Sequence, residues 1–348
     1  MGSVRQPVAH VVTGFPPAGR TASVPAGETG KLGQAVPDLE GLIVSVEAPG
    51  VASPSADDSD RAVRAVSSAE GFFRTEGDTL VPASFATSPW GQVLHGRLIG
   101  GLTARAAEQA RAGSAELACS RLTIDLFRSV PLAPITVTTT PVRAGRRIVV
   151  LDVTIEQGDG PVAQGRVVLL RRSEQPGGTF RTPPAWGAPT PPELGPPQPA
   201  SNRHWTAPWQ SWRTGGADGA MSDGLWIRDT HPLVSGEPLT PLMRAAMAAD
   251  LASPVSNSST RGLSFINADY TVYLGREPQG EYVGIQPAGH LSELGVAAGQ
   301  CVLHDLHGPV GFAATAAVAN PTLGSPAGNG GPRLGSRGWR AWRLAGRA

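Results

Sequence analysis

The chain has 348 residues, of which 44 are glycine and 33 are proline. These two types fill about a fifth of the positions, against an average of ~12%, so we expect long stretches without a packed core. The 29 basic and 28 acidic residues give a formal net charge of +1. That near-balance provides neither a basic field for nucleic acid nor a polybasic patch for a membrane surface, and both kinds of partner are disfavoured.

The two cysteines, Cys119 and Cys301, lie in apolar strand-like runs and have no CxxC partner. The sequence therefore predicts neither a metal site nor a disulfide framework. No run approaches the ~18 consecutive apolar residues of a membrane span, and the N-terminal stretch lacks the apolar region of a signal peptide. We expect a cytoplasmic protein without a membrane span.

Composition divides the chain into five parts. Residues 1–68 are rich in Ala, Gly, Pro, Ser and Val, and we expect a disordered extension or a start site assigned too early. A first folded block at 69–173 is followed by a linker at 174–221, where repeated proline removes backbone donors and keeps the chain extended. A second folded block at 222–319 precedes a tail, 320–348, which we expect to be disordered.

The two folded blocks carry the same elements in the same order. The first begins with a strand-like run at 72–83 and a helix-like run at 98–113, and the second with 225–229 and 240–253. Alternating polar and apolar residues follow each helix, at 121–127, 135–143, 146–157 and 161–172, and again at 263–276, 281–288, 299–306 and 309–318. Such alternation indicates antiparallel strands with one buried face. The sequence predicts an α+β fold in which a helix and a meander of four strands occur twice.

Two pairs of residues share one spacing. Arg128 closes the run IDLFR and Arg276 closes VYLGR, 148 residues later; the GPV turn at Gly160 recurs at Gly308, again 148 residues later. Two anchors at one offset indicate an internal duplication. A single sheet of this kind leaves an edge unpaired, and pairing with its copy would remove that edge. We therefore expect a pseudo-dimer within one chain, with each helix covering a sheet.

His95 and Gly96 stand directly before the first predicted helix. A helix N-terminus presents free N–H groups and partial positive charge, which suits a carbonyl or phosphate oxygen. A lone histidine is more often a hydrogen-bonded structural residue than a base, so both readings of His95 stay open.

Asp250 lies late in the second predicted helix, among apolar residues. A carboxylate that faces an apolar sheet must be hydrogen-bonded or carry a raised pKa; the alternative is a carboxylate that faces solvent. Asn267 and Asp269 interrupt the next apolar strand, and alternation places both on one face with Phe265 and Thr271. A carboxylate on the helix and a polar group on the adjoining strand are the parts needed to orient a water.

Several motifs together resemble one family. They are SPW, HG, GGL, LTIDLFRSVP and VRAGRRI in the first block, and GEPLTPLMRAAMAADLAS, FINADYTVYLGREP and GPVG in the second. In this order they resemble the double hotdog acyl-CoA thioesterases, and within them the actinobacterial thioesterase-like proteins related to the TesB-like, type II enzymes. The resemblance covers about 70–173 and 222–318. It implies two repeats of a helix wrapped by a curved antiparallel sheet, hydrolysis of acyl-CoA to fatty acid and CoA, and no cofactor or metal.

The resemblance also implies roles for particular residues. In that family an Asp on the second helix, a Thr on the following strand and a Gln on the last strand position a water against the thioester carbonyl. The matching positions here are Asp250, Asn267 and Thr315, with Ala316 as the alternative for the last, and the run FAATAAV contains no Gln. Substrate contacts would come from His95, Gly96 and Asp269.

Three alternatives remain. The protein could be a catalytically weak or inactive acyl-CoA or acyl-carrier binding protein that kept the fold, because the family Gln is absent. A hotdog hydratase is disfavoured, since no segment carries the Asp and His spacing that such enzymes use. An assembly module stays open because hotdog sheets readily pair into homo-oligomers.

Overall fold

The computed structural model describes residues 69–202, 205–215 and 223–320. These residues all belong to one compact unit, Pro54–Ala348. The predicted extension at 1–68, and all of the predicted tail except Asn320, lie outside the described residues.

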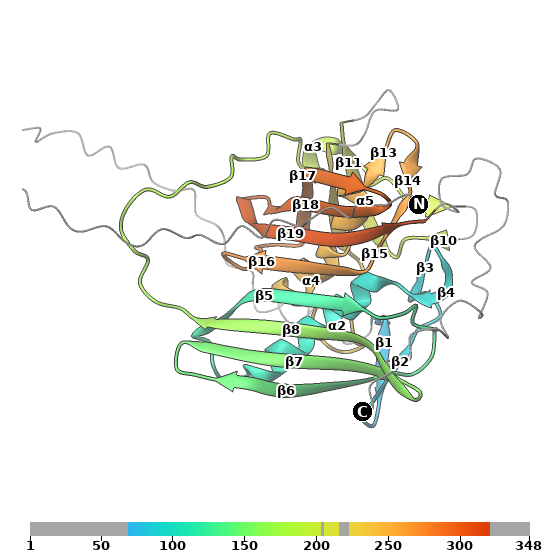
Figure 1. Ribbon diagram of the computed structural model, residues 1–348, viewed down its shortest axis with the longest axis vertical. Coiled ribbons are helices and arrows are strands. Elements are labelled where there is room, and N and C mark those ends of the chain that lie inside the picture. The colour runs from blue at the N-terminus through green and yellow to red at the C-terminus, as the bar shows by residue number, and fades with distance from the viewer. Residues whose placement is uncertain (1–68, 203–204, 216–222, 321–348) are drawn as a thin grey trace, which may run out of the picture. The chain divides into compact units, whose positions relative to one another are not determined.

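The first half contains one long helix and two hairpins that precede it (Figure 1). Its elements are β1 (Phe73–Glu76), β2 (Thr79–Pro82), β3 (Thr87–Ser88), β4 (Gly91–Leu94), α2 (Gly96–Ala110), β5 (Leu117–Leu126), β6 (Thr136–Ala144), β7 (Ile148–Gln157) and β8 (Gly160–Arg171). The expected strand at 72–83 is therefore a hairpin of β1 and β2, while the expected helix and the four strands after it are confirmed.

The second half repeats this order. The connecting segment holds α3 (Pro191–Leu194), β9 (Ser201–Asn202), β10 (Trp205–Thr206) and β11 (Trp209–Thr214). The half itself consists of β12 (Gly224–Asp229), α4 (Pro241–Ala249), α5 (Ala252–Ser256), β13 (Ser258–Ser259), β14 (Gly262–Leu263), β15 (Phe265–Asn267), β16 (Asp269–Leu274), β17 (Tyr282–Glu293), β18 (Val296–Asp305) and β19 (Gly308–Ala319).

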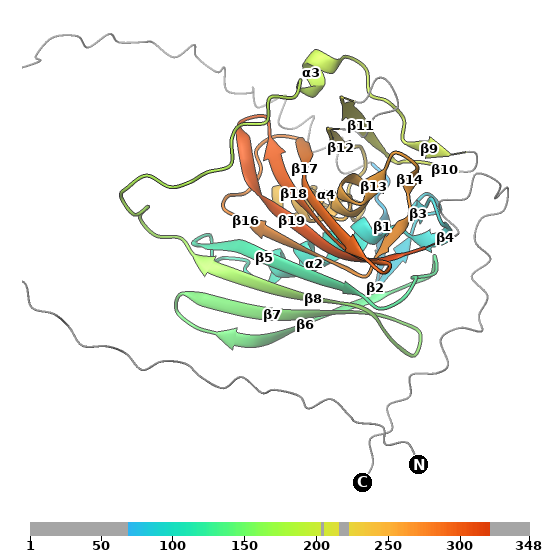
Figure 2. The ribbon, with the colours of Figure 1, turned by 45° about the horizontal axis from the view of Figure 1, so that its top comes forward.

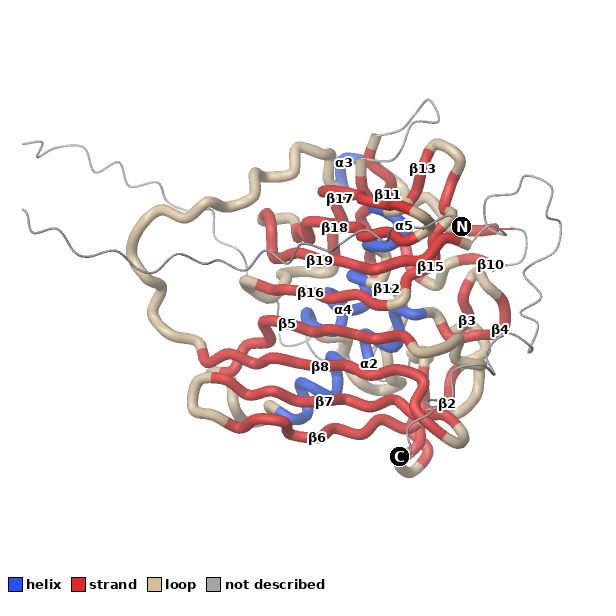
Figure 3. The backbone as a smooth tube through the Cα atoms, in the orientation of Figure 1, coloured by secondary structure: helices blue, strands red, loops and turns tan. Residues whose placement is uncertain are grey.

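A single 11-stranded sheet runs through both halves of the described chain. Its order is β11-β12-β17-β18-β19-β16-β5-β8-β7-β6, with β15 also paired to β19. Strand β16 of the second half pairs antiparallel with β5 of the first, so the predicted edge-to-edge union of the two copies is confirmed. The long helices α2 and α4 lie behind the strands in Figure 3, and Figure 2 shows them from a second angle.

The predicted meander is wrong for the first strand of each half. β5 pairs with β8, the last strand of its half, and β16 pairs with β19 in the same way. Only the last three strands of each half form a meander. The connection after β5 leads to β6, and the connection after β16 leads to β17; neither is a neighbour of the strand before it. β5 and β16 therefore each have one edge that is not paired within their own half, and these two edges pair with each other.

The two long helices pack closely because glycine and alanine line their contact. A Cβ on Gly100 of α2 would overlap the Tyr270 hydroxyl and lie 2.8 Å from the Ala246 carbonyl oxygen of α4. A Cβ on Gly101 would lie 2.9 Å from Met247 Cγ. Such distances are shorter than ordinary packing permits, so only glycine fits at these two positions.

The N-terminal capping expected for α4 is confirmed, but the helix is shorter than expected. Thr240 Oγ1 accepts a hydrogen bond from Met243 N at 3.2 Å, and Pro241 stands in the first turn. The helix ends at Ala249, and α5 begins at Ala252. The helix expected over 240–253 is therefore broken, and Asp250 lies at the break.

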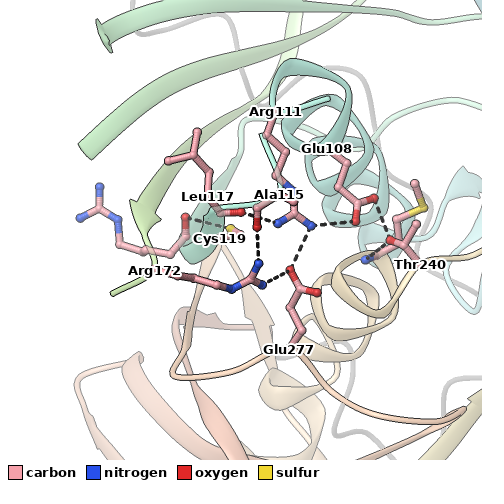
Figure 4. A network of polar contacts seen from close by, with 10 residues as sticks. Glu108, Arg111, Ala115, Leu117, Cys119, Arg172, Thr240 and Glu277 are labelled. Carbon is pink, nitrogen blue, oxygen red and sulfur yellow. Dashed lines mark hydrogen bonds and ion pairs between the residues drawn. The ribbon is translucent and has the colours of Figure 1, made fainter. Parts of the chain in front are cut away.

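A polar network joins the C-terminal end of α2 to the N-terminal end of α4 (Figure 4). Thr240 Oγ1 donates to Glu108 Oε2 at 2.7 Å, and Arg111 Nη2 donates to Glu277 Oε1 at 2.9 Å. Arg111 also lies 3.4 Å from Glu108 Oε1. Burial raises the pKa of Glu108, against the opposing effects of Thr240 and Arg111. The network therefore holds a partly desolvated carboxylate between the two halves.

The linker predicted for 174–221 is wrong in its second part. Strand β11 lies inside that range and pairs with β12 at the edge of the sheet. The proline-rich part is also packed rather than free, because the Trp226 indole N–H donates to Pro189 O at 3.1 Å and Trp186 stacks on Trp226 with ring centroids 5.1 Å apart. The segment covers part of the second half of the sheet.

Candidate active site

The Asp250 carboxylate lies where the two halves meet. The residue is 6% exposed, and its Oδ1 accepts a hydrogen bond from Asn267 Nδ2 at 3.2 Å. Its Oδ2 lies 3.3 Å from His95 Nδ1. A Cβ on Gly96 would lie only 2.7 Å from Oδ1, so the carboxylate packs directly against the first turn of α2. The predicted buried, hydrogen-bonded carboxylate is confirmed, and the solvent-facing alternative is wrong.

The N-terminus of α2 offers donors beside this carboxylate. His95 is the N-cap residue, and its carbonyl oxygen accepts from Leu98 N at 3.0 Å. Within the described part of the chain, the Gly96 N–H makes no hydrogen bond. A free N–H group at a helix start carries partial positive charge, so this end of α2 suits an oxygen that gains negative charge.

Two tryptophans hold the His95 ring. The Trp205 ring is stacked on it at a centroid distance of 6.0 Å, and the Trp209 ring meets it edge-on at 5.2 Å. Trp205 is itself fixed by a hydrogen bond from its indole N–H to Thr87 O at 3.0 Å. Both tryptophans come from the range predicted as a linker and were missed. The signal was present as Trp205, Trp209 and Trp212 in close succession, after the proline-rich run.

A buried guanidinium also packs against Trp209. Arg97 is fully buried, and its guanidinium carbon lies 4.3 Å from the Trp209 ring centroid. Its Nη2 is 2.6 Å from Asp229 Oδ1, but the two groups are not aligned as donor and acceptor. Cation–π contact and charge pairing thus compensate for burial and fix β12 against α2.

Tyr270 lies below the same turn of α2. Its hydroxyl donates to Gly96 O at 3.4 Å, and the side chain is fully buried. Burial, together with the nearby Asp250 carboxylate, raises the pKa of Tyr270 well above its ordinary value. The phenol is therefore neutral at physiological pH.

The expectation that Asn267 and Asp269 share a face is wrong. Asn267 pairs with Ala317 and Thr271 pairs with Ala314, so this strand has one more residue than β19 between the two pairs. An extra residue of this kind is a β-bulge, and it reverses the alternation of side chains. Asn267 therefore reaches Asp250, while the Asp269 carboxylate accepts from Ala316 N at 2.7 Å instead.

Asp269 faces another carboxylate across the sheet. It pairs with Asp125 of β5, and desolvation followed by repulsion from Asp269 raises the pKa of Asp125. The structure thus does not bring Asp269 to the group around Asp250, where a substrate contact was expected.

Thr315 is buried, but its hydroxyl is engaged elsewhere. Its Oγ1 donates to Asp269 O at 2.9 Å, and the residue is 4% exposed. The side-chain partners of Asp250 among the described residues are Asn267 and His95. Thr315, one of the two positions expected to match the family Gln, therefore supplies no hydrogen bond to the carboxylate.

The described residues contain no group of three or more His, Cys, Asp or Glu side chains suited to a metal ion. Among the described helices, none combines the length and the apolar character that crossing a membrane requires.

Comparisons with known proteins agree with this architecture. The model of the acyl-CoA thioesterase N-terminal domain matches residues 86–170, and that of the acyl-CoA thioesterase C-terminal domain matches residues 184–318. Together the two models cover most of the described chain in the order expected. The chain belongs to the acyl-CoA thioesterase family, and its two halves form a double hotdog.

Solved structures show the same fold at low sequence identity. A tesB protein of Mycobacterium avium subspecies paratuberculosis is 16% identical, with a TM-score of 0.51 over 75% of this chain and 99% of the other. A conserved protein of unknown function with a hot dog fold from Alicyclobacillus acidocaldarius is 19% identical, with a TM-score of 0.52 over 71% and 94% of the two chains. No curated protein matches the chain in sequence.

Proposed function

We propose that the protein hydrolyses acyl-CoA thioesters to free fatty acid and CoA, with the attacking water held between Asp250 and Asn267. The observation that carries this proposal is the buried Asp250 carboxylate, which is hydrogen-bonded to Asn267 and set against Gly96 at the junction of the two halves. Membership of the acyl-CoA thioesterase family supports the reaction class.

In this proposal Asp250 and Asn267 bind the attacking water, and the N-terminus of α2 binds the thioester oxygen. Each carboxylate oxygen has two lone pairs, so Asp250 Oδ1 accepts from Asn267 and still has a lone pair for a water. The Asn267 amide replaces the family Thr as a polar partner of that water. The Gly96 N–H, which lacks a protein acceptor among the described residues, would bind the thioester oxygen as it gains charge.

The test is release of free CoA from a panel of acyl-CoAs, followed with a thiol reagent. We expect Asp250→Asn to lower kcat by ~10²- to 10³-fold, as loss of a group that acts on the reacting atoms typically does. Asp152→Asn is the matched control, because Asp152 is bound to Arg166 on the sheet surface. An Asp250→Asn rate equal to the wild type would overturn the role given to Asp250.

One observation favours a second candidate, an acyl-CoA or acyl-carrier binding protein without turnover. The hydroxyl at the Gln position, Thr315, is bound to Asp269 O and does not reach Asp250. Calorimetric binding of a long-chain acyl-CoA, with no free CoA formed over the same period, would support this alternative and contradict hydrolysis.

A further inference from the structure

We propose that Ser292, His290 and Asn257 form a second site, in which Ser292 attacks an activated acyl ester or thioester and becomes acylated. None of the three residues takes part in the hydrolysis proposed above. Ser292 Oγ lies 2.9 Å from His290 Nε2, and His290 Nδ1 lies 2.8 Å from Asn257 Oδ1. A hydroxyl, a base within hydrogen-bond reach and a third group that orients the base are the parts of a nucleophilic site.

The partners of His290 define its tautomer. The Asn257 amide nitrogen donates to Ser253 Oγ at 3.3 Å, so the amide oxygen is the atom turned to the imidazole. An amide oxygen only accepts hydrogen bonds, and Nδ1 therefore carries the proton. In the neutral ring the lone pair is then on Nε2, where it accepts from the Ser292 hydroxyl. The Phe265 ring also meets the imidazole edge-on, with centroids 5.5 Å apart.

A glycine on the neighbouring strand brings Asn257 to the histidine. His290 and Ser292 are two residues apart on β17, so both side chains leave the same face of the sheet. His290 pairs with Gly299 of β18. A Cβ on Gly299 would overlap Ser256 Oγ and lie 2.6 Å from Asn257 Oδ1. Only glycine thus lets the end of α5 lie against the sheet at this point.

This site is separate from the one around Asp250. Ser292 pairs with Ala297 of β18, which pairs with Ala317 of β19. Ala317 in turn pairs with Asn267 of β15. Ser292 and Asn267 therefore stand at the two ends of one row across four strands, and three strand spacings place their backbones about 14 Å apart.

The nucleophile and its base are accessible, whereas the residue that orients the base is buried. His290 and Ser292 are exposed, and Asn257 is only 2% exposed. A buried amide with two hydrogen bonds holds the imidazole in one orientation. An ester in solution can therefore reach a hydroxyl whose proton acceptor is already in place.

The proposed step transfers the acyl group to Ser292. Oγ attacks the carbonyl carbon, its proton passes to His290 Nε2, and the carbonyl electrons move to the oxygen. The intermediate then collapses, the bond from the acyl carbon to the leaving oxygen or sulfur breaks, and the proton on Nε2 passes to the leaving atom. Water next attacks the acyl-serine in the same way, its proton passing through Nε2 to Oγ, and a carboxylic acid is released.

Labelling with a fluorophosphonate probe, which reacts with activated serines, tests the nucleophile. Peptide mass spectrometry of the labelled wild-type protein should find the phosphonate on Ser292. Ser259 is the internal control, because it is also exposed but its hydroxyl bonds the Gly262 carbonyl rather than a histidine. No label on Ser292, or labelling of Ser259 at the same rate, overturns the proposal.

Variants test the base and the independence of the two sites. His290→Gln should label ~10²-fold more slowly, as loss of a general base typically requires, while His307→Gln, at another exposed histidine, should label at the wild-type rate. Asp250→Asn should also keep the wild-type labelling rate, because the two sites share no residue. Equal rates for His290→Gln and the wild type overturn the proposal. Labelling without any release of free CoA from acyl-CoA would instead overturn only the hydrolysis proposed at Asp250.

A thiol at position 292 gives a second readout. The Ser292→Cys variant should be alkylated by iodoacetamide at neutral pH ~10-fold faster than the double variant that also carries His290→Gln, because a neighbouring histidine favours the thiolate. Cys119 and Cys301 are buried, and burial raises the pKa of both thiols to about 12, so they contribute little background. Equal alkylation rates for the single and double variants overturn the role given to His290.

Nitrogen-15 NMR tests the orienting role of Asn257. The wild-type spectrum should show His290 with its proton on Nδ1, and Asn257→Leu, which removes the acceptor, should lose this preference. A wild-type ring protonated on Nε2 alone overturns the proposal.

Discussion

Thr271 Oγ1 donates a hydrogen bond to Thr123 Oγ1, 3.1 Å away and 148 residues earlier in the chain. The two threonines also pair directly across β16 and β5. Because 148 is the offset of the duplication itself, each threonine faces its own counterpart, and the local twofold axis of the pseudo-dimer passes between them.

The duplication repeats a hydrogen bond as well. Arg128 Nη2 donates to Gly160 O at 3.3 Å, and Arg276 Nη2 donates to Gly308 O at 3.2 Å. These are the four residues whose spacing predicted the repeat. In both halves, the arginine that follows β5 or β16 donates a hydrogen bond to the glycine that begins β8 or β19.

A double-mutant cycle tests the threonine pair at the seam. Thr123→Val and Thr271→Val should each lower the free energy of unfolding by about 1 kcal/mol, because each leaves the other hydroxyl without its partner. The double variant should be less destabilised than the sum, since two valines pack together without an unpaired hydroxyl. Urea unfolding measures all four proteins, and strict additivity would show that the two hydroxyls do not interact.

Gly100→Ala tests the close contact of α2 with α4 and β16. The added methyl group would meet the Tyr270 hydroxyl and the Ala246 carbonyl, so we expect destabilisation of about 1 to 3 kcal/mol. Adding Tyr270→Phe removes one of these clashes and should restore part of the loss. Gly177→Ala, where a Cβ meets no atom within 4 Å, is the control. A neutral Gly100→Ala in thermal unfolding would contradict the packing described.

The free energy of unfolding should depend less on pH in Asp305→Asn than in the wild type. Burial raises the pKa of Asp305, but hydrogen bonds from Arg276, Gln279 N and His307 N outweigh this and leave the pKa below its ordinary value. A carboxyl with a lowered pKa stabilises the fold above its unfolded pKa, and this contribution is lost as the pH falls through the folded value.

The expected difference between wild type and Asp305→Asn follows from that sign. It should be about 2 kcal/mol near neutral pH, as for hydrogen bonds to a charged group, and should fade as the pH falls below ~4. Urea unfolding at a series of pH values measures it. A difference that is constant with pH would assign the effect to packing alone.

Asn267 can be tested against the residue that the family has at its position. Asn267→Thr keeps a polar group beside Asp250 and should retain most of the CoA-release rate. Asn267→Leu keeps the size but removes the donor to Oδ1, so we expect a kcat lower by ~10²-fold. Equal rates for the two variants would show that no hydrogen bond from this position acts in the reaction.

The sequence predicted the parts of the fold that depend on local patterning. Alternation gave the strands, and the offset between Arg128 and Arg276 gave the duplication. Strand order escaped prediction because alternation shows which face is buried but not which neighbour a strand takes; β5 and β16 both pair with the last strand of their half.

The site residues that local patterning marks were predicted, and those that depend on strand pairing were not. Asp250 and Asn267 were found because polar residues interrupt apolar runs, and His95 because it precedes a helix. Asp269 was misplaced because the bulge after Asn267 arises from pairing with β19, which is remote in sequence. Trp205 and Trp209 were missed because the linker predicted from the proline-rich run before them was extended across them, although their rings pack against His95.

The polar network in Figure 4 has a counterpart at the opposite ends of α2 and α4. The N-cap of α2, His95, faces a carboxylate near the end of α4, and the N-cap of α4, Thr240, faces Glu108 near the end of α2. The two corners are similar in arrangement, although the acids stand at different positions, 10 residues after Thr240 and 13 residues after His95. In the second, Arg111 pairs with both Glu108 and Glu277. One corner is thus closed by an ion pair with an arginine, whereas at the other the Asp250 carboxylate has only an amide and an imidazole as side-chain partners among the described residues.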